Sequence, residues 1–125
     1  MSERATRGGP RVLHVTHLTS GRVAELVRHY AEEQVASGLD VAVASPPIGS
    51  LSLDVQAMGA RSLHWHATRR PEPSAAEARD LRRIAARWEP DIVHLHTAKA
   101  GVAGRGVVPR SRPTVFQPHV WSFEG

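Results

Sequence analysis

Short apolar runs alternate with amphipathic segments along this chain, and this alternation restricts the possible fold more than any other feature. The apolar runs are rich in β-formers, as expected of strands that are buried on both sides. The expected strands are 11–16, 40–44, 61–67, 91–96 and 114–117. The expected helices are 22–37, 51–58, 74–89 and 97–108. This order predicts an α/β fold, a Rossmann-like doubly wound parallel sheet of five strands with helices on both faces.

Two of the expected helices carry clear end signals. Ser20 can cap the first helix, and Gly38 can end it. Ser74 and Glu77 have the spacing of a capping box, in which each side chain bonds the backbone of the other residue. Pro90 requires the helix at 74–89 to end by the preceding residue. These signals locate the ends of the helices that follow the first and third strands.

Right-handed connections between parallel strands favour the strand order 3-2-1-4-5. The order then reverses between the first and fourth strands, and a crevice is expected outside their carboxyl ends. Segment 17–21 follows the first strand and segment 96–101 follows the fourth, while 118–121 follows the fifth. The topology therefore gathers His17, His96 and His119 at one edge of the sheet.

Composition excludes several classes of function. The 125 residues suffice for one domain, 11–125, after a flexible leader at 1–10. The net charge is +4, but no basic run is interleaved with aromatic residues, so no nucleic-acid partner is expected. The sequence has no cysteine, which excludes disulfides and thiolate chemistry. The absence of an apolar run of membrane-span length and of a signal core predicts a cytoplasmic location.

Histidines occur in H-x-H pairs, a spacing that could place two metal ligands side by side. His64 and His66 form one H-x-H pair, and His94 and His96 form another. Residues two apart on a strand share a face, so each pair could hold one ion. Zinc would need a third ligand and carboxylates that orient the histidines, and acidic residues are scarce near these positions. We therefore predict no metal site, with the first pair solvated on an edge strand and His94 buried beneath the fourth helix.

The segment after the fourth strand holds a lysine and a glycine, Lys99 and Gly101, in the first turn of a weak helix. A lysine there can pair with a phosphate or carboxylate, or can simply be solvated. Gly21 leaves a similar choice between phosphate contact and a tight turn. Neither G-x-G-x-x-G nor a Walker-type loop is present, which disfavours dinucleotide and P-loop functions.

Several segments of the chain resemble the N-terminal domain of family 4 glycosyltransferases, the retaining nucleotide-sugar enzymes of GT-B architecture. The matching stretches are RVLHVTHLTSG, DVAVASP, WEPDIVHLHTAKAGVAGR and RPTVFQPHVWSFEG. The resemblance implies that Ser20 and Gly21 approach the donor diphosphate, although Arg22 replaces a usual second glycine. It implies that Thr97, Lys99 and Gly101 face the cleft, and that His119 lies near the reacting sugar as the catalytic residue.

The resemblance further implies a partial acceptor-side domain whose C-terminal donor domain is missing, so that the isolated chain is inactive. The full enzyme is expected to transfer a sugar from a nucleotide-sugar donor to a polysaccharide or lipid-linked acceptor, with no cofactor. The alternatives are a non-catalytic α/β binding or interaction module and a metal-dependent hydrolase built on H-x-H. The arginine-bearing helix suggests peripheral contact with anionic lipid at the inner face of a membrane.

Overall fold

A computed structural model of the chain describes residues 9–105 and 114–116. Within these residues, five parallel strands form one sheet in the order β3-β2-β1-β4-β5. The strands are β1 (Arg11–Val15), β2 (Asp40–Ser45), β3 (Arg61–His64), β4 (Ile92–Leu95) and the short edge strand β5 (Thr114–Phe116). The predicted parallel α/β sheet is confirmed, and the order reverses between β1 and β4 as expected. Most of the expected leader at 1–10 lies outside the described residues.

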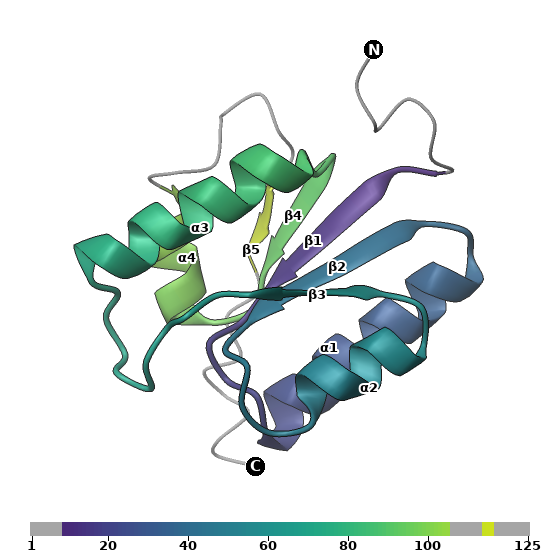
Figure 1. Cartoon of the computed structure of the whole chain (residues 1–125), viewed down its shortest axis with the longest axis horizontal. Coiled ribbons are helices and arrows are strands. Elements are labelled where there is room, and N and C mark those ends of the chain that lie inside the picture. Colours follow the sequence, from purple (N-terminus) through teal and green to yellow (C-terminus); the bar gives the residue numbers. More distant parts are fainter. Residues whose placement is uncertain (1–8, 106–113, 117–125) are drawn as a thin grey trace.

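Helices cover both faces of this sheet (Figure 1). They are α1 (Gly21–Ala36), α2 (Leu51–Ala57), α3 (Ala75–Trp88) and α4 (Ala98–Arg105). Figure 1 shows α1 and α2 together on one face and α3 and α4 on the other. The end of α4 expected at 106–108 lies outside the described residues. No helix in the described part of the chain is long and apolar enough to cross a membrane.

The alternating direction of strand side chains divides the core into two apolar clusters. Leu13, Val15, Val93 and Leu95 face the α3 and α4 side, where Trp65 is fully buried among them. On the opposite face, Val27 of α1 and Leu51 and Val55 of α2 pack on Val41 and Val43 of β2. Each face thus buries apolar side chains from strands and helices together, which is the arrangement expected for a two-side-covered parallel sheet.

The third strand is shorter than expected. It ends at His64 rather than at residue 67, because its neighbour β2 ends at Ser45 and two prolines follow there. The last ladder bond runs from the backbone N–H of Trp65 to the carbonyl of Ser45, at 3.0 Å. Trp65 then turns into the core, and its indole N–H donates to the carbonyl of Glu77 at 2.8 Å. The extra apolar residues of this run therefore belong to the core under α3 rather than to the strand.

The helix ends test the expected caps. In α3 the capping box is complete, with Glu77 N–H donating to Ser74 Oγ and Ser74 N–H donating to the Glu77 carboxylate. Ser20 is the N-cap residue of α1 but makes no side-chain capping bond. Gly38 follows the helix with a φ of +90°, which an L side chain rarely adopts. The predicted boundaries of both helices are confirmed to within one residue.

Candidate functional site

The carboxyl ends of β1 and β4 meet at the point where the strand order reverses. Here the structure brings together two predicted site residues that lie 80 positions apart in the sequence. Nδ1 of His17, two residues after β1, lies 2.9 Å from Oγ1 of Thr97, two residues after β4. The structure therefore joins one residue from each strand end by a hydrogen bond, at the edge of the sheet where the topology predicts a crevice.

Thr97 has two structural contacts at once. Its Oγ1 accepts a hydrogen bond from the backbone N–H of Ala100 at 3.1 Å, which satisfies one of the open donors in the first turn of α4. The same oxygen contacts the ring of His17. A hydroxyl has one donor and two acceptor positions, so it can serve both neighbours. Thr97 is therefore a fixed link between the start of α4 and the loop after β1.

His17 is half-buried beside a charged pair. Burial lowers the pKa of His17 to about 4, with a further lowering by the charge of Lys99 that the charge of Glu77 partly opposes. The imidazole is consequently neutral at pH 7, with one ring nitrogen protonated and the other an acceptor. A neutral histidine at the edge of the crevice can donate or accept one hydrogen bond, but it carries no charge for an anion.

Ser20 and Gly21 are exposed at the start of α1. Gly21 has a φ of +75°, and a Cβ placed on it would meet no atom within 4 Å. Glycine is thus required there for the backbone conformation, since the space beside it is open. The first backbone N–H groups of a helix have no partner inside the helix, and the Ser20 side chain does not cap them. Binding of an anion at this end of α1 stays a prediction.

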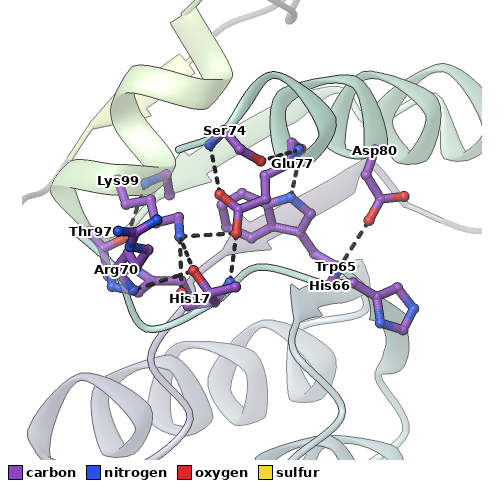
Figure 2. Close-up of polar contacts among 11 residues, drawn as sticks. His17, Trp65, His66, Arg70, Ser74, Glu77, Asp80, Thr97 and Lys99 are labelled. Carbon is purple, nitrogen blue, oxygen red and sulfur yellow. Dashed lines mark hydrogen bonds and ion pairs between the residues drawn. The ribbon is translucent and has the colours of Figure 1, made fainter. Parts of the chain in front are cut away.

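Lys99 is the clearest departure from expectation, because it is buried, with 1% of its surface exposed. Its Nζ donates to the carbonyl of Thr68 at 2.9 Å, to Oγ1 of Thr68 at 3.3 Å and to Oε2 of Glu77 at 3.1 Å. An ammonium group has three donors, and these three acceptors satisfy them. Of the two alternatives, the solvated lysine is therefore wrong. In this structure the ammonium group binds the protein itself rather than facing a ligand (Figure 2).

Glu77 is the partner that sequence reasoning recognised only as part of a cap. Its Oε1 accepts from Ser74 N–H at 2.7 Å, and its Oε2 accepts from Thr68 N–H at 2.6 Å as well as from Lys99. Burial by itself raises the pKa of Glu77, but the hydrogen bonds from Ser74, Thr68 and Lys99 outweigh it and lower the pKa to about 2. The carboxylate thus ties the loop before α3 to the start of α4 (Figure 2).

His96 and Gly101 are also buried, so neither presents its surface to the crevice in this structure. The backbone N–H of His96 donates to the carbonyl of Val15 at 3.0 Å, which continues the register of β4 and turns the side chain to the α1 face. Nε2 of His96 lies 2.8 Å from Nδ1 of His14. The expectation that His96 joins His17 at the crevice is therefore wrong, and strand parity is the reason.

His94 needs a similar correction. Its ring lies 5.1 Å from the ring of Tyr30 in α1, measured between centroids, and not beneath α4. Val93 and Leu95 take the α4 face, so His94 must point to the other side. By contrast, His64 and His66 are exposed at the β3 edge, as predicted. His119 lies outside the described residues, and its role stays a prediction.

A family comparison decides what kind of domain this is. The sequence model described as a glycosyl transferase 4-like domain matches residues 23–125. The chain belongs to the glycosyl transferase 4-like family. The match includes α1 except its first two residues, the strand and loop that carry Thr97, and the region of His119. It begins two residues after Gly21, so the loop at 17–21 is placed by the structure alone. No curated protein matches the chain in a sequence search.

Solved structures of two glycosyltransferases share the fold of this glycosyl transferase 4-like domain. A glycosyltransferase from Rickettsia africae has a TM-score of 0.66 at 16% identity, covering 86% of this chain and 29% of its own. The glycosyltransferase of kitacinnamycin has a TM-score of 0.63 at 18% identity, covering 87% and 30%. The chain thus spans about three tenths of their length. A universal stress protein from Archaeoglobus fulgidus has a TM-score of 0.51 at 14% identity, covering 86% and 92%.

Proposed function

We propose that this domain forms the acceptor-side wall of a retaining glycosyltransferase of GT-B architecture. The reaction is transfer of a hexose-type sugar from a nucleoside diphosphate-sugar to a hydroxyl of a polysaccharide or lipid-linked acceptor. The observation that supports it best is the contact between His17 and Thr97 at the reversal of strand order, a few residues from the open N-terminus of α1. In this proposal most donor contacts come from a second domain.

Ser20 and Gly21 form the donor-facing part of the proposed site. The positive end of the dipole of the sixteen-residue α1 lies at Ser20 and Gly21. A diphosphate bound there would be held by backbone donors, and the conformation of Gly21 allows close approach. Negative charge builds up on the diphosphate as it leaves the sugar. The end of α1 can therefore stabilise the transition state more than the bound substrate.

His17 and Thr97 form the sugar- or acceptor-facing part. With Thr97 Oγ1 donating its hydroxyl proton to Nδ1, the neutral ring of His17 keeps its proton on Nε2 and can donate to a sugar or acceptor oxygen. By resemblance, His119 lies near the reacting sugar and helps to hold it. In this scheme these side chains act by positioning and hydrogen bonding, without a metal or a carboxylate nucleophile on this domain.

The direct test is turnover by this domain joined to a donor domain of a glycosyltransferase. We expect His17→Ala and His119→Ala each to lower kcat/KM by about 10²-fold or more, because each removes an oriented hydrogen bond to a reacting group. His64→Ala on the exposed edge strand is the matched control and should leave the rate unchanged. Normal turnover in both site variants would contradict the proposal.

Binding by the chain alone separates this function from a non-catalytic interaction module. A ligand that binds only the folded state raises thermal stability, by about 2.7 kcal/mol at 100 times its Kd. We expect nucleoside diphosphates to raise the melting temperature of the wild-type chain and to have less effect on Gly21→Val, which is strained at a positive φ. If nucleotides do not raise the melting temperature of the chain, and the domain joined to a donor domain shows no turnover, the interaction module is favoured.

The outer face of α3 supports a second proposal, contact with an anionic membrane surface at the inner side of the cell. Four arginines on this helix are exposed: Arg79, Arg82, Arg83 and Arg87. Each basic residue near an anionic surface contributes about 1 kcal/mol of attraction. We expect the chain to bind phosphatidylglycerol vesicles at low salt and not phosphatidylcholine vesicles. Replacement of all four arginines by glutamine should abolish this binding; unchanged binding would show that α3 is not the contact.

A further inference from the structure

Three buried histidines converge beneath α1, away from the proposed glycosyl-transfer site. His14 of β1 stands directly opposite His94 of β4 in the strand register, and His96 follows two residues later on the same face. Their exposed fractions are 0%, 8% and 0%. The sequence showed the pair His94 and His96 but no third ligand. The pairing of β1 with β4 supplies that third imidazole, from 80 residues earlier in the chain.

The three rings are close enough to share one ion. One nitrogen from each ring can be chosen so that all three atoms lie within 4.8 Å of one another. The rings of His94 and His96 stack with centroids 3.9 Å apart, and that of His14 lies 5.2 Å and 5.0 Å from them. Nδ1 of His14 and Nε2 of His96 are separated by 2.8 Å. Adjacent parallel strands hold all three side chains, so their arrangement rests on backbone pairing rather than on a loop.

Gln34 of α1 provides the outer contact that a metal-binding histidine normally has. Its Oε1 lies 2.7 Å from Nε2 of His14 and accepts a hydrogen bond from the protonated nitrogen. This fixes the tautomer of His14, and its Nδ1 lone pair then points at the other two rings. Ligating histidines nearly always donate their second N–H to such an acceptor. The acceptor is an uncharged amide, so it orients the ring without adding a negative charge.

We propose that His14, His94 and His96 bind one divalent transition-metal ion of the zinc class. Three neutral imidazoles suit zinc, cobalt, nickel or copper, whereas calcium and magnesium need oxygen ligands. On binding, the proton of His96 moves from Nε2 to Nδ1. His96 Nε2, His14 Nδ1 and one ring nitrogen of His94 then each give a lone pair to the metal. No proton is lost. Zinc–nitrogen bonds of about 2.05 Å place the nitrogens about 3.3 Å apart, so the two rings separate by about half an ångström.

Such an ion would join β1 and β4 through its three ligands, and α1 through the hydrogen bond of His14 to Gln34. Its role would be structural, because the three ligands are buried. The strand-end residues His17 and Thr97 form a hydrogen bond with one another. The metal-free protein keeps a hydrogen-bonded chain from His96 through His14 to Gln34. Binding therefore replaces one satisfied arrangement by another and need not be required for folding. This proposal does not depend on the proposed glycosyl transfer.

The test uses the untagged chain, stripped of metal by a chelator and dialysed. Cobalt(II) is the first probe, because it gives intense visible absorption in a tetrahedral nitrogen site. Zinc is then measured by competition with cobalt and by elemental analysis. We expect one ion per chain and a rise in melting temperature with zinc but none with magnesium or calcium. Since the ligands are buried, the samples should be warmed and followed until the absorption is constant.

Variants locate the site. His94→Gln and His96→Gln should each abolish the cobalt absorption, while Gln34→Leu should weaken zinc binding by about 10- to 100-fold. The control is His64→Gln with His66→Gln, which removes the exposed H-x-H pair and should change nothing. Far-UV circular dichroism checks that each variant is folded. Absence of cobalt absorption in the folded wild-type chain overturns the proposal, as does its persistence in folded His94→Gln.

Discussion

The two faces of the sheet bury polar groups in opposite ways. Beneath α3 and α4, the polar group is a full ion pair, with every Lys99 donor and both Glu77 oxygens bonded. Beneath α1, the polar group is a cluster of imidazoles around His14 with an amide neighbour and no ion pair among the described contacts. The first arrangement is stable only while both charges are present. In the second, burial lowers the pKa of His14 to about 4, so this ring is neutral at pH 7.

The largest predicted effect is loss of one partner from the ion pair. Lys99→Met leaves the Glu77 carboxylate buried without its cation, and such a change typically costs about 3–5 kcal/mol of unfolding free energy. Urea denaturation measures the loss. The double variant Lys99→Met with Glu77→Gln should recover part of it, because the isolated charge is removed. Arg82→Gln on exposed α3 is the control, with a change within about 0.5 kcal/mol. Equal losses for Lys99→Met and Arg82→Gln would contradict the role of the pair.

Acid should reduce the stabilisation by Glu77 and by His17 in different pH ranges. The pKa of Glu77 is lowered from 4.5 to about 2, so its stabilisation is complete above pH 4.5 and is lost as the pH falls toward 2. The pKa of His17 is lowered from 6.5 to about 4 by burial and by Lys99. The unfolded chain therefore takes up this proton first, and stability falls between pH 6.5 and 4.

Urea denaturation across pH, with chelator present, separates these contributions. We expect His17→Gln to reduce the slope of stability against pH between 6.5 and 4, and Glu77→Gln to reduce it between 4.5 and 2. The two effects should be of similar size, because the two pKa values are lowered by similar amounts. Unchanged slopes in both variants would mean that neither group titrates as described.

On the neutral face, the expected loss is smaller. Gln34→Leu removes the acceptor at 2.7 Å from Nε2 of the fully buried His14. An unsatisfied buried donor costs about 1–3 kcal/mol, less than an isolated charge. The matched control is Gln56→Leu on the exposed side of α2, which we expect to change stability little. A loss for Gln34→Leu as large as that for Lys99→Met would remove the distinction between the two faces.

The sequence predicted what depends on neighbouring residues and missed what depends on distant pairing. Apolar runs, the capping box at Ser74 and the prolines located every described element. The partner of Lys99 was not predictable, because Glu77 lies 22 residues away and Thr68 lies 31 away. Nor was the contact of His14 with His96, which needs the register of β1 against β4. Even the strand parity that paired His94 with His96 did not show which face they occupy.

A further comparison concerns the two N-caps, Ser74 of α3 and Ser20 of α1. Ser74 Oγ accepts from Glu77 N–H, whereas Ser20 makes no side-chain capping bond. Ser74→Ala should therefore cost about 1 kcal/mol in urea denaturation, and Ser20→Ala less than about 0.5 kcal/mol.

If the start of α1 holds the donor diphosphate, Ser20→Ala should instead reduce the rise in melting temperature produced by nucleoside diphosphate, which Ser74→Ala should leave intact. A large stability loss in Ser20→Ala, with unchanged nucleotide response, would mean that Ser20 caps its helix as Ser74 does. The open helix end would then be closed to a ligand, and the proposed donor contact would move elsewhere in the crevice.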